Sequence, residues 1–209
     1  TSAVHPAIGV VGLELGHGIE LSAFVGKREV HVLGHFIDPT DQALAGFSAL
    51  LRRERESRMV QMVEKMNELG YPVSMADVRA IAQDAHLGRP HLARALVQRG
   101  WVVDTKEAFD RFLGDGRPAF ADRYRVTAEE AIELIRRARG TATLAHPGVS
   151  RVDRPELEAL ASAGLSGIEA AHSDHPPSLR EKYLRIAREL DLVPTAGSDF
   201  HGEKVAPTR

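Results

Sequence analysis

The 209-residue sequence contains no cysteine, which excludes disulfides, thiolate metal sites and cysteine nucleophiles. It also lacks a run of about 18 apolar residues and a signal-peptide pattern, so neither a membrane span nor secretion is expected. The default location is therefore cytoplasmic. With a formal charge of -2 the chain has no overall basic surface for nucleic acid. Any phosphate-bearing ligand must be held by local groups.

What is present is typical of a soluble globular protein, with 43% hydrophobic and 27% charged residues. This length favours one domain, or one domain with a sizeable insertion. Strands are predicted at 8–13, 18–24 and 29–37, with Gly26-Lys27 as the turn between the last two. The pattern then changes sharply at Pro39.

The segment from 40 to about 125 is predicted to be helical. Apolar residues recur at helical spacing between Gln42 and Gly70, and Ser74 with Asp77 has the pattern of a capping box. Shorter helices are predicted at 90–98 and 106–113. We therefore expect residues 40–125 to form a helical domain inserted between 1–39 and 126–209.

After a helix that starts at Thr127, strands alternate with helices. Strands are predicted at 141–145, 165–171 and 192–196, with helices at 154–163 and 177–190. Such alternation is typical of parallel βαβ units, whose ligand sites lie at the carboxyl ends of the strands.

Each of these three strands is followed by histidine: His146 after the first, His172 and His175 after the second, and His201 after the third. A lone histidine is more often a satisfied, partly buried side chain than a ligand. Three consecutive strand ends with histidine favour metal or phosphate chemistry instead.

Asp199 precedes His201 by two residues, so at a strand end both side chains would point to the same side of the pleat. They would offer one oxygen and one nitrogen ligand to a metal. The alternative is an ordinary turn, because Gly197 and Gly202 bracket the pair.

Two N-terminal residues extend the candidate set. Glu20 lies between apolar neighbours, as a ligand carboxylate would, although an edge-strand charge is the alternative. His31 follows on the next strand, and His35 on the same face is the weaker candidate. Carboxylates and imidazoles without thiolates suit Mn, Fe or Zn in a multinuclear hydrolytic site better than Ca or Cu(I).

Five short strings together resemble the PHP (polymerase and histidinol phosphatase) superfamily. The resemblance is closest to its small metal-dependent phosphoesterases, which act on nucleoside 3',5'-bisphosphates and short RNA 5' ends. It covers residues 18–203 and implies a distorted (βα)7-type barrel with a helical insertion domain and two or three divalent metal ions, with manganese first and iron or zinc as alternatives. The strings begin at Gly18 (GIELSA), Val30 (VHVLG), Gly88 (GRPHLARALV), Leu144 (LAHP) and Gly197 (GSDFHG).

The resemblance implies that Glu20 bridges metals and that the other ligands are His31, His146, Asp199 and His201. It implies substrate-phosphate contacts for Arg89, His91 and His175, although Arg89-Pro-His91 also reads as the first turn of a helix. The implied reaction is hydrolysis of a phosphate monoester of a small nucleotide by a metal-bound hydroxide, with no protein nucleophile. A short oligonucleotide is a further expected partner.

The family begins with a His-x-His strand and a Thr-Asp-His-Asp segment, and neither occurs in this chain. We therefore expect an N-terminally incomplete barrel and little activity from the 209 residues alone. The alternatives are a truncated, non-catalytic PHP-like module and a histidinol-phosphate phosphatase. Retention of all five candidate ligands favours an enzyme over the module.

Overall fold

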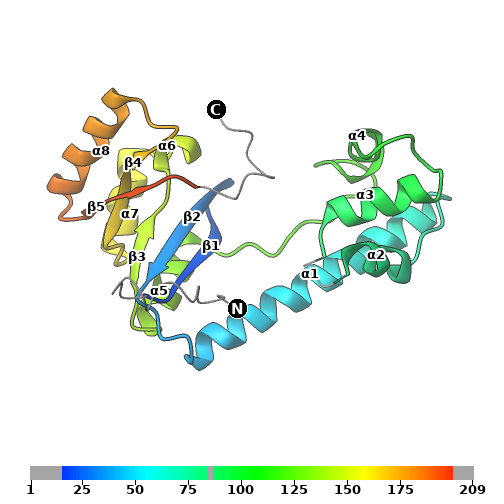
Figure 1. The fold of residues 1–209 in the computed structure, drawn as a ribbon, viewed down its shortest axis with the longest axis horizontal. Coiled ribbons are helices and arrows are strands. Elements are labelled where there is room, and N and C mark those ends of the chain that lie inside the picture. The colour runs from blue at the N-terminus through cyan, green and yellow to red at the C-terminus, as the bar shows by residue number, and fades with distance from the viewer. Residues whose placement is uncertain (1–15, 84–86, 200–209) are drawn as a thin grey trace, which may run out of the picture. The chain divides into compact units, whose positions relative to one another are not determined.

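The computed structural model describes residues 16–83 and 87–199 of the chain (Figure 1). The chain divides into two compact units, one made of Thr1–Leu44 with Arg125–Arg209 and the other of Ala45–Tyr124. We call them the sheet unit and the helical unit. The strand predicted at 8–13 lies outside the described residues.

The sheet unit contains, in its described part, a five-stranded sheet with the strand order β1-β2-β3-β4-β5. The pairs from β1 to β3 are antiparallel and those from β3 to β5 are parallel. The strands are β1 (Gly18–Val25), β2 (Arg28–His35), β3 (Thr141–Leu144), β4 (Gly167–His172) and β5 (Val193–Gly197). The helices are α5 (Ala128–Arg137), α6 (Pro147–Ser150), α7 (Arg154–Ser162) and α8 (Pro177–Glu189).

The hairpin of β1 and β2 has the turn that the sequence predicts. Val25 pairs with Arg28, which leaves Gly26 and Lys27 as the two loop residues. Gly26 has a φ of 59°, a conformation that two-residue hairpin turns require and that glycine adopts without steric cost. This turn fixes the register of the ladder, in which Glu20 lies opposite Leu33.

The two faces of the sheet differ in what they contact. Gly34 packs against Ile135 of α5, so close that a Cβ at Gly34 would lie 3.0 Å from that side chain. Because side chains alternate along a strand, His31 and His35 point to the opposite face. The ladders place Glu20 and Glu169 on that same face. We call it the site face.

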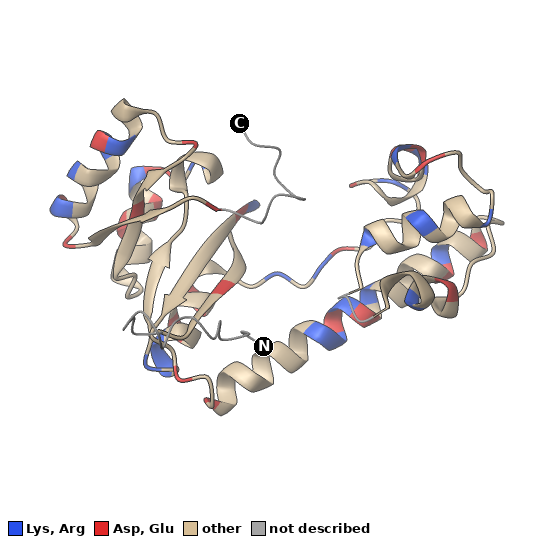
Figure 2. Cartoon of the chain, viewed as in Figure 1, with Lys and Arg blue, Asp and Glu red and all other residues tan. Residues whose placement is uncertain are grey.

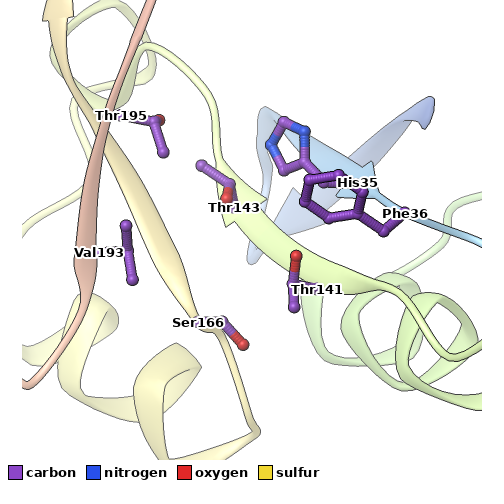
Figure 3. Close-up of a pocket in the computed structure, with 7 residues that line it drawn as sticks. All are labelled: His35, Phe36, Thr141, Thr143, Ser166, Val193 and Thr195. Atoms are coloured by element: carbon purple, nitrogen blue, oxygen red, sulfur yellow. The ribbon is translucent and has the colours of Figure 1, made fainter. Parts of the chain in front are cut away.

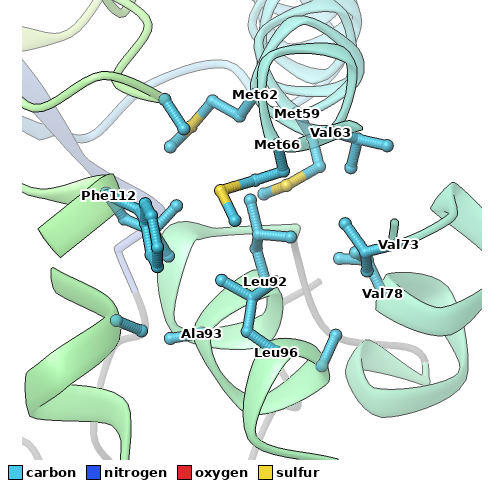
Figure 4. Close-up of a cluster of buried hydrophobic side chains, with 14 of the residues drawn as sticks. Met59, Met62, Val63, Met66, Val73, Val78, Leu92, Ala93, Leu96 and Phe112 are labelled. Carbon is cyan, nitrogen blue, oxygen red and sulfur yellow. The ribbon is translucent and has the colours of Figure 1, made fainter. Parts of the chain in front are cut away.

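The helical unit contains, among its described residues, most of α1 (Gln42–Glu68), and α2 (Met75–Ala82), α3 (Arg89–Gln98), α4 (Thr105–Ala108) and the π-helical turn η2 (Phe109–Leu113). Methionines of α1 pack on leucines of α3 in its core (Figure 4). Burying such a side chain contributes about 1.5–3 kcal/mol, so this core stabilises the unit. Its largest fully buried members are Met62, Met66, Leu92, Leu96 and Leu113.

The start of α2 confirms the predicted capping box. The Ser74 hydroxyl accepts a hydrogen bond from the Asp77 N–H at 3.2 Å, and the Asp77 carboxylate accepts one from the Ser74 N–H at 2.8 Å. The two side chains therefore satisfy amides that the first helical turn leaves without partners.

The predicted helix at 106–113 differs in its second half, where η2 replaces an α-helix. The Gly114 N–H donates to the Phe109 carbonyl at 2.9 Å, which is the i to i+5 pattern of a π-helix. A Cβ at Gly114 would lie 2.7 Å from that carbonyl, so a glycine permits the close approach.

Basic side chains gather on α8 and in the middle of α1, where acidic side chains are interspersed (Figure 2). Within the described ranges, no helix is both long and apolar enough to cross a bilayer.

Candidate metal centre

Glu20 and His31 meet across the β1–β2 ladder. Leu33, the register partner of Glu20, lies two residues from His31, so the two side chains are diagonal neighbours on the site face. An Oε1 oxygen of Glu20 lies 2.7 Å from Nδ1 of His31. The Glu20 side chain is 42% exposed and that of His31 is 31% exposed, so both remain accessible to a ligand.

His146 reaches the same point from the end of β3. The Ala145 N–H donates to the His31 carbonyl at 2.9 Å and thereby holds the chain beside β2. His146 then turns with φ 26° and ψ 58°, a conformation rarely adopted outside glycine. Its Nε2 lies 3.2 Å from Nδ1 of His31.

These three residues form a group suited to a metal ion. One ligand atom from each of Glu20, His31 and His146 lies within 4.8 Å of the others. One carboxylate oxygen with two imidazole nitrogens is a donor set that Mn, Fe and Zn accept. The residues therefore fit a divalent metal, and His146, the most buried of the three, is 8% exposed.

A cavity of about 280 Å³ adjoins this group, and its lining includes Glu20, His146, Glu169 and Asp199. Among the residues that the structure describes, no Lys or Arg belongs to its wall. The carboxylates of Glu20, Glu169 and Asp199 in this wall contribute negative potential, which favours a cation.

Asp199 shares this cavity, but not through the pleat geometry that the sequence predicts. The residue lies beyond the end of β5 and has a φ of 51°, which is left-handed rather than extended. The prediction that the Asp199 side chain follows the alternation of an extended strand is therefore wrong. His201 lies outside the described residues.

Glu169 is a site-facing residue that the sequence interpretation does not include. It lies in β4 and is only 4% exposed, and its Oε2 accepts a hydrogen bond from the His146 N–H at 2.7 Å. The signal was present in the sequence, because a carboxylate interrupts the apolar run Gly167-Ile-Glu-Ala-Ala171. Glu20 stands out in the sequence for the same reason, because it lies between Ile19 and Leu21.

His175 is engaged inside the fold rather than at the cavity. Its Nδ1 lies 3.1 Å from the Ala170 carbonyl and therefore carries the proton, while its Nε2 accepts the Gly148 N–H at 3.1 Å. His175 is 1% exposed. Both nitrogens thus have backbone partners, and neither is open to a phosphate in this arrangement.

His172 lies between His146 and His175, with ring centroids 5.4 Å from each. Its Nδ1 accepts the Asp174 N–H at 3.1 Å, whereas its Nε2 is buried and has no hydrogen-bond partner among the described residues. A row of imidazoles therefore leads from the candidate ligands into the core.

Arg89 and His91 belong to the helical unit, at the start of α3. The Arg89 guanidinium donates to the Asp115 carboxylate at 2.6 Å and lies over the rings of Phe109 and Phe120, 5.6 Å from each centroid. His91 accepts the Gly88 N–H at 3.0 Å through its Nδ1. This closes the first turn of the helix, which is the structural alternative that the sequence also offered.

A second guanidinium, that of Arg58, lies over the ring of Phe120. Arg58 of α1 lies 5.6 Å from the centroid of Phe120 and donates to the Ala121 carbonyl at 2.7 Å. Burial lowers the pKa of Arg58, and the nearby charges of Arg89 and Arg123 lower it further. The charges of Asp115 and Asp122 act in the opposite direction and raise this pKa in part.

His35 lines a different cavity of about 350 Å³ on the site face, together with Phe36 and residues of β3 and β5 (Figure 3). Phe36 is 73% exposed and Val193 is 62% exposed, so this region presents apolar side chains. His35 does not join the group of Glu20, His31 and His146. Its rank as the weaker candidate agrees with this separation.

Comparison with known proteins identifies relatives along most of the chain, although no family model matches. A 5'-3' exoribonuclease of Haemophilus influenzae is 33% identical and aligns with 91% of this chain and 71% of its own length. A 3',5'-nucleoside bisphosphate phosphatase of Chromobacterium violaceum is 32% identical over 91% of this chain and 68% of that protein.

Solved structures agree with these relatives. A structure described as a metal-dependent phosphoesterase, from Bifidobacterium adolescentis, superposes with a TM-score of 0.73 at 31% identity and covers 97% of this chain and 73% of that chain. An amidohydrolase from Chromobacterium violaceum, solved with sulfate and no metal, has a TM-score of 0.69 at 30% identity over 93% of this chain and 70% of that chain.

The mixed α/β fold and the carboxylate-imidazole group define a metal-dependent phosphoesterase, which is a hydrolase. More narrowly, the chain belongs to the PHP superfamily, in the group that contains these exoribonucleases and nucleoside bisphosphate phosphatases.

Proposed function

We propose that this chain contributes to hydrolysis of a phosphate monoester on a small nucleotide, with a nucleoside 3',5'-bisphosphate as the preferred substrate. The observation that carries the proposal is the convergence of Glu20, His31 and His146, whose ligand atoms lie within 4.8 Å of one another. The bisphosphate phosphatase and exoribonuclease relatives support the nucleotide substrate.

Glu20, His31 and His146 would hold a divalent metal, and we propose Asp199 and His201 as further ligands and manganese as the first candidate ion. Metals bound there would lower the pKa of water and neutralise charge on the phosphoryl oxygens. The carboxylates at the cavity supply the negative charge that retains such ions. His146 contributes by its fixed backbone, which orients its imidazole before a ligand arrives.

For phosphate recognition we propose Arg89, with His91 beside it on the first turn of α3. Arginine suits this role because its planar fork can donate two hydrogen bonds to one phosphate. The two flanking aromatic rings hold the guanidinium in one orientation. Phosphate would have to displace the Asp115 carboxylate, which is 82% exposed and therefore free to move away.

The same family assignment supports a finer description of the fold. We propose that the described sheet is part of a distorted (βα)7-type barrel, with 1–39 and 126–209 in the barrel and 40–125 as its helical insertion. The parallel β3–β4–β5 segment with intervening α7 and α8 supports this proposal.

The proposal is tested by comparing three substrates side by side with added Mn²⁺. These are adenosine 3',5'-bisphosphate, histidinol phosphate and a 5'-phosphorylated short RNA. We expect phosphate release to be fastest from the bisphosphate and to disappear on addition of a chelator. Faster release from histidinol phosphate would overturn the substrate choice, and release unaffected by chelation would overturn the metal dependence.

A further inference from the structure

Glu169 of β4 is a buried carboxylate that lines the candidate metal cavity together with His146. It is 4% exposed, and the N–H of His146 is its hydrogen-bond partner at 2.7 Å. Among the described residues no Lys or Arg forms an ion pair with it. A carboxylate is costly to bury, so its retention at this position calls for a role that offsets the cost.

The hydrogen bond acts on a strained piece of backbone. His146 has a φ of 26° and a ψ of 58°, outside the regions that a non-glycine residue ordinarily occupies. Such a conformation persists only where neighbouring groups hold it. The Glu169 carboxylate binds the amide of this same residue, and charge-assisted hydrogen bonds are among the stronger ones.

The conformation of His146 in turn determines where its ring lies. With the backbone turned in this way, Nε2 lies 3.2 Å from Nδ1 of His31 and so joins the group with Glu20. Loss of the turn would carry the imidazole away from the other two ligand atoms.

Gly197 of β5 makes room for the carboxylate. A Cβ at this position would collide with Oε1 of Glu169. Gly197 has no positive φ that would explain the glycine by itself. The absence of a side chain at Gly197 is therefore matched to the position of Glu169.

We propose that Glu169 is a positioning residue of the metal centre. Its carboxylate accepts a hydrogen bond from the backbone amide of His146 and so holds that residue in its ligand conformation, and the absence of a side chain at Gly197 leaves room for the carboxylate. This inference deepens the proposed function and rests on it. Glu169 acts through His146, so its loss affects metal affinity before it affects any chemistry. Groups that orient metal ligands change affinity by about 10–100-fold when removed.

The test is a titration of the purified chain with Co²⁺ alone. Binding is monitored through the visible absorption bands of the ion, which report the geometry of its ligands. Glu169→Ala is expected to weaken Co²⁺ binding by about tenfold or more and to change the bands. Glu169→Gln keeps an oxygen that can accept from the His146 N–H, so we expect binding within about threefold of the unsubstituted chain. Glu181→Ala, an exposed glutamate on α8, is the matched control.

A second variant reaches the same contact from the other side. Gly197→Ala should displace the carboxylate and weaken Co²⁺ binding by a similar factor. In the background of Glu169→Ala the collision is gone, and the added alanine should cause no further loss. Thermal unfolding of each variant verifies that the chain is folded during the titration.

The outcomes separate this inference from the proposed function. Unchanged Co²⁺ binding in Glu169→Ala, or a loss in Glu169→Gln as large as in Glu169→Ala, would overturn the positioning role while the metal site stands. Additive losses for Gly197→Ala and Glu169→Ala would also overturn it. If the unsubstituted chain binds no Co²⁺, the proposed function fails and this inference fails with it.

Discussion

Nε2 of His146 lies 3.2 Å from Nδ1 of His31, although 115 positions separate the two residues in the sequence. The β2–β3 ladder brings them together, since it ends where the Ala145 N–H donates to the His31 carbonyl. An oxygen of Glu20 lies 2.7 Å from the same His31 nitrogen. The sheet register therefore assembles the candidate ligands, and each ligand can be tested by itself.

His31→Ala is expected to lower the affinity for Mn²⁺ by about tenfold or more, because it removes one of three convergent donor atoms. His35→Ala is the matched control, since this residue lies on the same strand and face but lines the other cavity. Calorimetric titration with Mn²⁺ measures both. Equal affinity in the two variants would exclude His31 from the metal group.

Arg89→Ala is expected to weaken binding of adenosine 3',5'-bisphosphate by about tenfold, because hydrogen bonds to a charged group contribute about 1.5–3 kcal/mol. Asp115→Ala is the matched control, because it removes only the carboxylate that holds the guanidinium at 2.6 Å. Binding should be unchanged or tighter in this control. If the dissociation constant of adenosine 3',5'-bisphosphate for Arg89→Ala equals that for the unsubstituted chain, Arg89 does not recognise the phosphate.

Asp77 links the stability of the helical unit to pH. Hydrogen bonds from the Arg99 side chain, and then from the backbone and hydroxyl of Ser74, lower the pKa of Asp77 to about 2. Since its pKa in unfolded chains is about 3.9, the carboxylate stabilises the fold above that value and loses this effect as the pH falls through about 2.

Asp77→Asn is therefore expected to lower the melting temperature at neutral pH, with a difference that shrinks as the pH falls from about 4 toward about 2. Circular dichroism melts of the two chains across this range provide the measurement. A difference that stays constant with pH would show that ionisation of Asp77 does not contribute.

Leu92→Ala is expected to destabilise the helical unit by about 2–5 kcal/mol, because Leu92 of α3 is fully buried in the core and its truncation leaves a cavity. Leu69→Ala is the control, since Leu69 is 42% exposed and surface changes usually stay within about 0.5 kcal/mol. Urea unfolding monitors both. Equal midpoints would mean that Leu92 does not belong to the core.

Local patterns were sufficient to predict most secondary-structure elements. The glycine turn at Gly26 and the alternation along β2 predicted the hairpin, and apolar spacing in α1 predicted its helix, because both depend on neighbours in sequence. The π-helical turn at 109–113 was not predicted, since it depends on the close packing of Gly114 on the Phe109 carbonyl.

The site was predictable only where a residue type stood out from its surroundings. Glu20 and His31 were identified in this way, and Glu169 could have been. The left-handed backbone at Asp199 could not be predicted, because composition does not encode a φ value. The backbone partners of His175 could not be predicted either, because the Gly148 N–H belongs to a segment distant in the sequence and the Ala170 contact depends on how the chain turns after β4.

The most direct measurement is the metal content of the purified chain by elemental analysis, beside the double variant Glu20→Ala with Asp199→Ala. The account predicts at least one equivalent of Mn, Fe or Zn in the unsubstituted chain and a loss of that metal in the variant. No bound metal in the unsubstituted chain, or equal metal in both, would contradict a metal centre at Glu20, His31 and His146.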